Sequence, residues 1–134
     1  MANATTSWCN TNLNYFPHNQ AITTIPTMYL AYFTVTPTTA GGGTEVTLVQ
    51  VTNYARVSLT GTTTWTNAAA NTLNNAVQIN LVVPAGGTGA SVVAWGLYDA
   101  AVGGNLLFFG PVTFAWTTGS VYVIPVGSFT ISLN

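Results

Sequence analysis

Short strand-favouring runs, each ended by a turn residue, constrain the fold of this chain most strongly. From residue 28 onward, runs rich in Val, Ile, Leu, Thr and aromatic residues alternate with Gly, Pro and Asn. Turn signals recur about every 8 to 12 residues, which is typical of an antiparallel sandwich or barrel. We therefore predict an all-β fold, an antiparallel β-sandwich or flattened barrel of about eight strands. The expected strands are 28–36, 45–52, 55–61, 76–83, 91–99, 105–116, 121–126 and 128–133.

Residues 1–26 differ from the rest, being rich in Asn and Thr and without a sustained hydrophobic period. We expect an extended N-terminal arm there, followed by a β-sandwich domain over residues 27–134. The arm carries Trp8, Tyr15 and Phe16 among polar residues. Because Trp and Tyr are enriched at protein interfaces, these three side chains are candidate anchors on a neighbouring protein.

Only three side chains carry a formal charge, Glu45, Arg56 and Asp99, and the formal net charge is −1. About a quarter of the residues in a soluble domain are normally charged. A chain this neutral is poorly protected against association, which suits a subunit of an assembly. It also lacks the basic surface that binds phosphate backbones, so a nucleic-acid partner is excluded.

The hydropathy pattern argues against a membrane partner. The most apolar stretch, residues 91–112, is interrupted by Asp99, Asn105, Pro111 and several glycines. A spanning helix needs about 18 or more consecutive apolar residues. The first residues have neither the positive nor the apolar region of a signal peptide. We therefore expect a protein made in a cytoplasm and not exported by the general route.

Catalytic and metal sites lack the residues that they need. With one cysteine, Cys9, no internal disulfide forms. One Cys, one His and two acids are too few ligands for a structural zinc site, and we expect neither a metal nor a cofactor. A triad of His18, a serine and Asp99 has no nucleophile-elbow pattern. A carboxylate pair of Glu45 and Asp99 would require the two to lie close together. The prediction is a non-enzymatic protein.

Two other patterns have simpler structural explanations. The glycine runs 41–43 and 86–89 lack the lysine and the following helix of a phosphate-binding loop, and fit hairpin loops. The C-terminal aromatic residues suggest either a carbohydrate platform or core packing, and core packing is favoured because acids are scarce. These residues are Trp65, Trp95, Tyr98, Phe108, Phe109 and Trp116.

The single arginine is the one charged residue with an expected local role. Arg56 lies within an expected strand, and Asp99 lies at the end of another. A guanidinium in so neutral a chain is well suited to hold a carboxylate and backbone carbonyls. We therefore expect a structural ion pair of Arg56 with Asp99 or Glu45. The alternative is contact of Arg56 with a partner subunit.

Four blocks of sequence resemble small β-proteins from the virion modules of tailed bacteriophages. They are MYLAYFTVTPTTAGGGTEV (28–46), YARVSLT (54–60), WGLYDAAVGGNLLFFGPVT (95–113) and VIPVGSFTISLN (123–134). The resemblance covers most of the chain from Met28 onward, in the same order. The family often begins with a short, charged helical lead, which the Asn- and Thr-rich start does not resemble. Its members are tail-fibre-like, minor structural or decoration proteins, and no catalytic residue is implied.

The resemblance and the neutral composition together predict a bacteriophage virion structural protein. The first expectation is a capsid decoration (cement) protein on the capsid surface, which binds the major capsid protein and copies of itself, with a trimer as one arrangement. The alternative is a tail-fibre or baseplate component with a receptor- or glycan-binding role. Many symmetric copies of a cement protein would supply avidity, whereas a tail component would be present in only a handful of copies.

Overall fold

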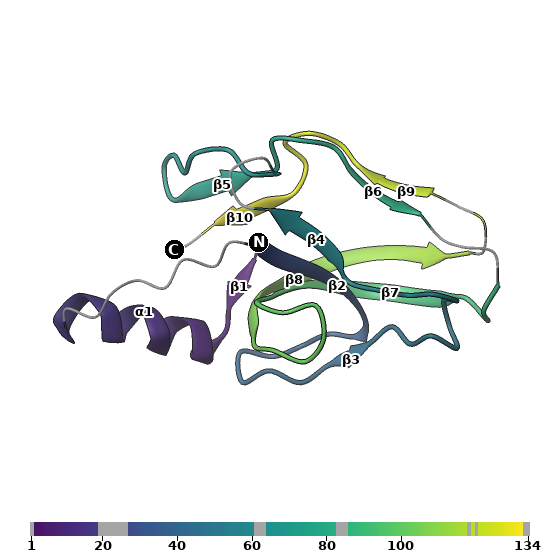
Figure 1. The fold of residues 1–134 in the computed structure, drawn as a ribbon, viewed down its shortest axis with the longest axis horizontal. Coiled ribbons are helices and arrows are strands. Elements are labelled where there is room, and N and C mark those ends of the chain that lie inside the picture. The colour runs from purple at the N-terminus through teal and green to yellow at the C-terminus, as the bar shows by residue number, and fades with distance from the viewer. Residues whose placement is uncertain are drawn as a thin grey trace.

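The computed structural model describes residues 2–18, 27–60, 64–82, 86–117, 119 and 121–132. Its strands pair antiparallel, which confirms the all-β fold class, and one helix lies near the N-terminus (Figure 1). The elements are β1 (Asn3–Ala4), α1 (Thr6–His18), β2 (Thr27–Val35), β3 (Thr44–Glu45), β4 (Val57–Thr60), β5 (Thr72–Asn74), β6 (Ile79–Val82), β7 (Ala90–Tyr98), β8 (Leu106–Trp116), β9 (Val121–Ile124) and β10 (Thr130–Ser132).

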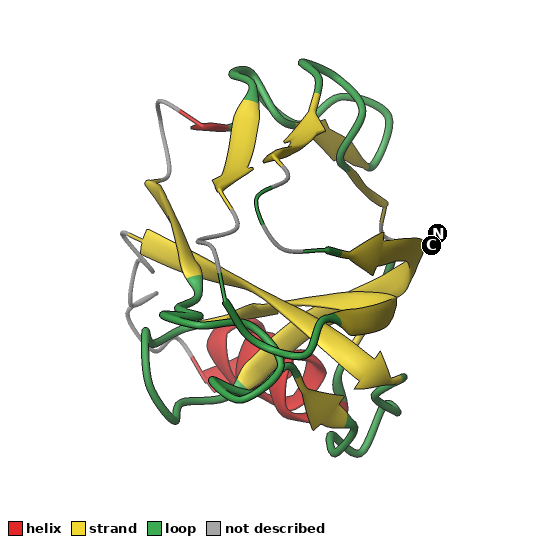
Figure 2. Ribbon diagram, turned by 90° about the vertical axis from the view of Figure 1, so that its right-hand side faces the viewer, coloured by secondary structure: helices red, strands yellow, loops and turns green. Residues whose placement is uncertain are grey.

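The main sheet has the strand order β1-β8-β7-β2-β3, and β4 also pairs with β2. Two small sheets, β6 with β9 and β5 with β10, lie over one face of it (Figure 2). This is a sandwich-like arrangement and not a closed barrel. The apolar strands β7 and β8 lie inside the main sheet, as their continuous hydrophobic runs predict.

The larger hydrophobic cluster lies between the main sheet and the small sheets. Tyr32 of β2 and Trp95 of β7 point into it, while Ala31 and Ala94 belong to a second cluster on the other side of these strands. The Trp95 ring lies against the backbone of Gly110 on β8, where an added Cβ would lie 2.6 Å from a ring carbon. Glycine at that position therefore allows the close packing of the indole on the sheet.

Residues 45–52 are not the strand that their alternating pattern predicts. Only Glu45 belongs to a strand, β3, and a turn follows at residues 48–50. The Gln50 side chain accepts hydrogen bonds from both the backbone N–H and the hydroxyl of Thr47. Such local side-chain bonds compete with pairing in a sheet. Val46 and Val51, which the alternating pattern assigns to opposite faces of a strand, are both buried at the two ends of the turn, while Leu48 and Val49 are exposed.

The N-terminal segment was expected to be extended, but residues 6–18 form α1. Thr5 caps this helix, because its hydroxyl oxygen accepts a hydrogen bond from the N–H of Trp8. The same hydroxyl donates to the carbonyl of Leu106 on β8. Trp8 packs on Phe108, with 5.4 Å between ring centroids. The helix has only a weak apolar stripe, so docking against β8 supplies stability that the sequence pattern does not show.

The start of the chain is also part of the core. Asn3 and Ala4 in β1 pair with Phe109 and Phe108 on β8, and Ala2 is buried. The expected boundary between the arm, 1–26, and the β-domain, 27–134, adjoins residues 19–26, which lie outside the described residues. Among the residues that the structure describes, no helix is long and apolar enough to cross a membrane.

We expect Thr5→Val to lower the free energy of unfolding by about 1–2 kcal/mol, because it removes the helix cap and strands a buried carbonyl. Urea denaturation of the full chain measures the change. Thr113→Val, at an exposed position on β8, is the control and should differ from the parent by less than about 0.5 kcal/mol. An equal effect of the two variants would contradict this role of Thr5.

Candidate functional site

The three formally charged side chains gather near one end of the main sheet. Glu45 ends β3, Arg56 immediately precedes β4, and Asp99 immediately follows β7. Arg56 and Glu45 form a bidentate ion pair, with 3.0 Å from Nε to Oε1 and 2.8 Å from Nη2 to Oε2. The Arg56 side chain is only 9% exposed and that of Glu45 is 25% exposed. The pair is therefore largely withdrawn from water.

Arg56 also holds the loop that joins β7 to β8. Its Nη1 donates to the carbonyls of Ala100, at 2.9 Å, and Gly103, at 2.7 Å. The guanidinium lies 3.5 Å from the ring centroid of Tyr98. Burial alone would lower the pKa of Arg56, but the hydrogen bonds and charge of Glu45 outweigh it and raise the pKa. With most of its N–H groups engaged inside the protein, Arg56 is a structural clamp and not an anion-binding group.

Tyr54 completes this cluster from the other side of Glu45. Its hydroxyl donates to Glu45 Oε1 at 2.9 Å and accepts a hydrogen bond from the backbone N–H of Tyr32 at 3.1 Å. Burial raises the pKa of Tyr54 well above its ordinary value, and the bond from Tyr32 only partly opposes this. Burial likewise raises the pKa of Tyr98, although the charge of Arg56 acts in the opposite direction. Both phenols are therefore held in the neutral form.

Asp99 does not join the ion pair. Its carboxylate accepts hydrogen bonds from the backbone N–H of Asn105 at 2.7 Å and from the Asn105 amide at 2.9 Å. These bonds close the loop of residues 100–104. Of the two partners left open by the sequence, the structure thus places Glu45 against Arg56 and uses Asp99 to shape the loop that Arg56 holds.

Of the N-terminal residues singled out from the sequence, the structure describes the side chains of Trp8 and Cys9. Trp8 is half-buried against β8, while Tyr15 and Phe16 lie on α1 with side chains outside the described part. The His18 side chain is likewise not described, and Cys9 is exposed. Within the described residues, no group of three or more His, Cys, Asp and Glu side chains is positioned to hold a metal. Glu45 and Asp99 have different hydrogen-bond partners and act separately.

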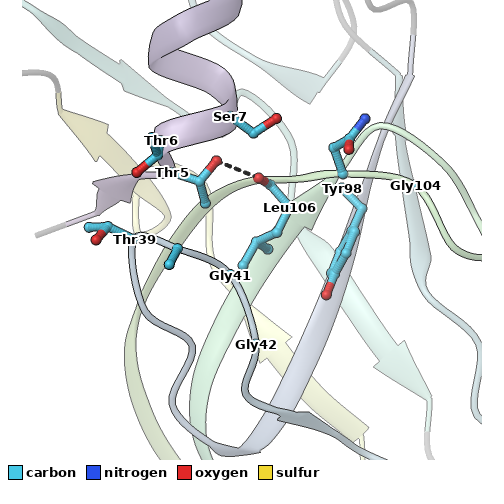
Figure 3. Close-up of a pocket in the computed structure, with 11 residues that line it drawn as sticks. Thr5, Thr6, Ser7, Thr39, Gly41, Gly42, Tyr98, Gly104 and Leu106 are labelled. Atoms are coloured by element: carbon cyan, nitrogen blue, oxygen red, sulfur yellow. Dashed lines mark hydrogen bonds between the residues drawn. The ribbon is translucent and has the colours of Figure 1, made fainter.

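A pocket of about 290 Å³ is lined in part by Tyr98, which also contacts this cluster (Figure 3). Three segments form it: the start of α1, the loop that follows β2, and the loop between β7 and β8. Its lining contains hydroxyl, amide and glycine residues and no formally charged side chain. The lining residues are Thr5, Thr6, Ser7, Thr39, Ala40, Gly41, Gly42, Tyr98, Gly104, Asn105 and Leu106. The pocket has no sequence signature, because its residues come from separate segments without a motif.

The comparison with known families settles the class of the protein. The family described as podophage GP4 fiber I protein gp80 matches residues 3–132. The chain belongs to this family. The gp80 match includes β1 and α1 as well as the β-sheets, so the N-terminal segment is part of the family pattern. A comparison with the curated proteins finds no match.

Membership of the gp80 fiber family makes the protein a bacteriophage structural protein. The resemblance to virion proteins of tailed phages is thereby confirmed. The family description names a fiber, which agrees better with the tail-fibre alternative than with capsid decoration.

Arg56→Ala should lower the free energy of unfolding by about 2–4 kcal/mol, since Glu45 loses its partner and two carbonyls lose their donor. The partial exposure of Glu45 keeps the effect below that of a fully buried pair. Arg56→Lys retains the charge without the planar fork and should restore only part of the loss. Chemical denaturation of the three proteins measures this, and a loss below about 0.5 kcal/mol in Arg56→Ala would contradict the clamp.

Alkaline pH should destabilise the fold through Tyr54. Its pKa is raised in the folded state, so its contribution to stability is fully present below about pH 10, the ordinary value for tyrosine, and is lost as the pH rises further. The melting temperature should therefore fall from about pH 10 upward. Tyr54→Phe removes this ionisation and should give a shallower fall, measured by calorimetry across the same pH range. An equally steep profile in Tyr54→Phe would rule out this origin.

Proposed function

We propose that the protein is a non-enzymatic fibre component of a bacteriophage virion, carried on the tail and bound to copies of itself and to another virion protein. The observation that supports this most directly is the match of residues 3–132 to a phage fiber family. Fibre assembly is a function of surfaces and repeated copies, and it does not require a reacting group.

The arrangement of charges supports a role in assembly. Arg56 and Glu45 satisfy each other, and Asp99 is engaged by Asn105, so the formal charges are used to hold loops. Much of the remaining described surface consists of neutral polar and apolar side chains. A partner that covers this surface does not have to desolvate unpaired charges, which is the costly part of burying polar groups.

The exposed apolar residues also support a role in assembly. Large hydrophobic side chains with more than two fifths of their area in solvent occur on several elements of the described chain. They include Leu13, Val35, Leu48, Val49, Val77, Val102, Val121, Val123 and Val126. Contact between copies would cover some of this area and stabilise the assembly through apolar burial.

Location and copy number in purified particles test the proposal. We expect few copies per particle relative to the major capsid protein, measured by quantitative gel electrophoresis. Electron microscopy with a labelled antibody fragment should show the label at the tail. Label over the whole head, with a copy number comparable to that of the major capsid protein, would overturn the fibre role and favour capsid decoration.

Light scattering of the purified protein tests self-association. A molar mass that is a multiple of 14.0 kDa is expected. A strictly monomeric protein at high concentration would contradict contact between copies.

A further inference from the structure

We propose that the pocket between the start of α1, residues 39–42 and the loop between β7 and β8 binds a neutral carbohydrate ring. This would give the proposed fibre a contact with a surface glycan, so its biological role rests on the fibre function, although the binding itself does not. We refer to this feature as the hydroxyl pocket (Figure 3).

The charge of the lining restricts the ligand class. No lining residue of the hydroxyl pocket carries a formal charge. The two nearest charged groups have internal partners, since Arg56 binds Glu45 and two carbonyls, and Asp99 binds Asn105. A cation would lose hydration on entry and find no carboxylate. An anion would meet the start of α1, but the N–H groups of Thr6, Trp8 and Cys9 already donate to Thr39 and Thr5, which weakens that end as an anion site. A neutral ligand has no such disadvantage.

The polar groups of the pocket are suited to a ligand with several hydroxyls. Thr6 and Ser7 at the start of α1 and Thr39 on the opposite loop contribute hydroxyl side chains to the lining. A hydroxyl both donates and accepts hydrogen bonds, so it can match the hydroxyls of a sugar in either direction. Tyr98 and Asn105 add a phenol and an amide from the third segment.

The loop opposite α1 is held in place before any ligand arrives. Thr38 and Gly41 exchange two backbone hydrogen bonds of 3.1 and 2.9 Å, and the Thr38 hydroxyl also donates to the carbonyl of Gly41. The N–H of Thr6 donates to the carbonyl of Thr39 at 2.8 Å, which ties the loop to the helix. A site fixed in this way loses less conformational entropy when a ligand binds.

Glycines leave the rim open to a ring. Gly41 and Gly42 have φ values of +93° and +80°, which favour glycine, and an added Cβ at either would meet no atom within 4 Å. The volume of about 290 Å³ lies at the lower end for small-ligand sites, which suits one sugar ring. Because Arg56 lies over the Tyr98 ring and Phe33 stacks on it with 6.3 Å between ring centroids, the pocket is expected to contact sugar hydroxyls and not to stack on a sugar face.

NMR titration of the isotopically labelled full chain tests the inference. The probes are D-glucose, D-galactose and N-acetyl-D-glucosamine, with N-acetylneuraminic acid as the anionic comparison. At least one neutral sugar should give saturable shifts of the amides of Thr6, Ser7, Thr39 and Asn105, with a Kd on the order of 1 mM for a single ring. Repeated copies within a fibre would raise the overall affinity by avidity.

Matched variants separate the pocket from the rest of the surface. Ser7→Ala and Thr39→Val should each weaken binding about fivefold through the loss of one hydrogen bond. Thr113→Val on β8 lies outside the pocket and should leave the Kd unchanged. The dispersion of the amide spectrum shows that each variant is folded.

Several results would overturn the inference: no saturable shift up to about 100 mM of any neutral sugar, shifts confined to other segments, or equal binding by the Thr39→Val variant. Tighter binding of N-acetylneuraminic acid would also overturn it, because the argument requires a neutral ligand. These outcomes do not depend on where the protein lies in the virion. Sugar binding by a protein found on the capsid would therefore refute the fibre role and not the pocket.

Discussion

The ion pair between Arg56 and Glu45 is the interaction on which one end of the main sheet, with the hydroxyl pocket beside it, depends. One guanidinium connects the end of β3, the chain that enters β4, the ring of Tyr98 and two carbonyls of the following loop. Elsewhere, the sheets are held by backbone pairing and apolar burial, which do not define the path of a glycine-containing loop. The clamp supplies that definition where the end of β3, the chain that enters β4 and the loop after β7 converge.

The clamp also shapes the surface beside it. Tyr98 has Arg56 on one face and borders the hydroxyl pocket, and the loop held by Arg56 supplies Gly104 and Asn105 to the same pocket. Asp99 closes this loop through Asn105. The scarce charges therefore organise a neutral polar site without contributing a charge to its lining. A protein of this composition can thus present a well-defined surface while remaining neutral toward its neighbours in an assembly.

The N-terminal segment shows where sequence reasoning was weakest. The sequence makes Trp8 a candidate anchor on a neighbouring protein. In the structure Trp8 packs on Phe108 of the same chain, and the segment that carries it forms a helix capped by Thr5 and docked on β8. A run of Asn and Thr has low intrinsic helix preference, and it gives no amphipathic pattern from which a helix would be predicted. The strand expected at residues 45–52 failed for the opposite reason, because its alternation was clear but a local bond between Thr47 and Gln50 formed a turn.

The sequence by itself determined the all-β class, the positions of β2, β7 and β8, and the scarcity of charge, because strand preference and charge are properties of neighbouring residues. It also limited the partners of Arg56 to two carboxylates. Only the tertiary structure decided between Glu45 and Asp99, docked α1 and assembled the hydroxyl pocket. Each of these depends on segments far apart in the chain, such as Thr5 with Leu106 and Arg56 with Gly103. Contacts of this kind follow from strand order and loop packing, which local sequence patterns do not encode.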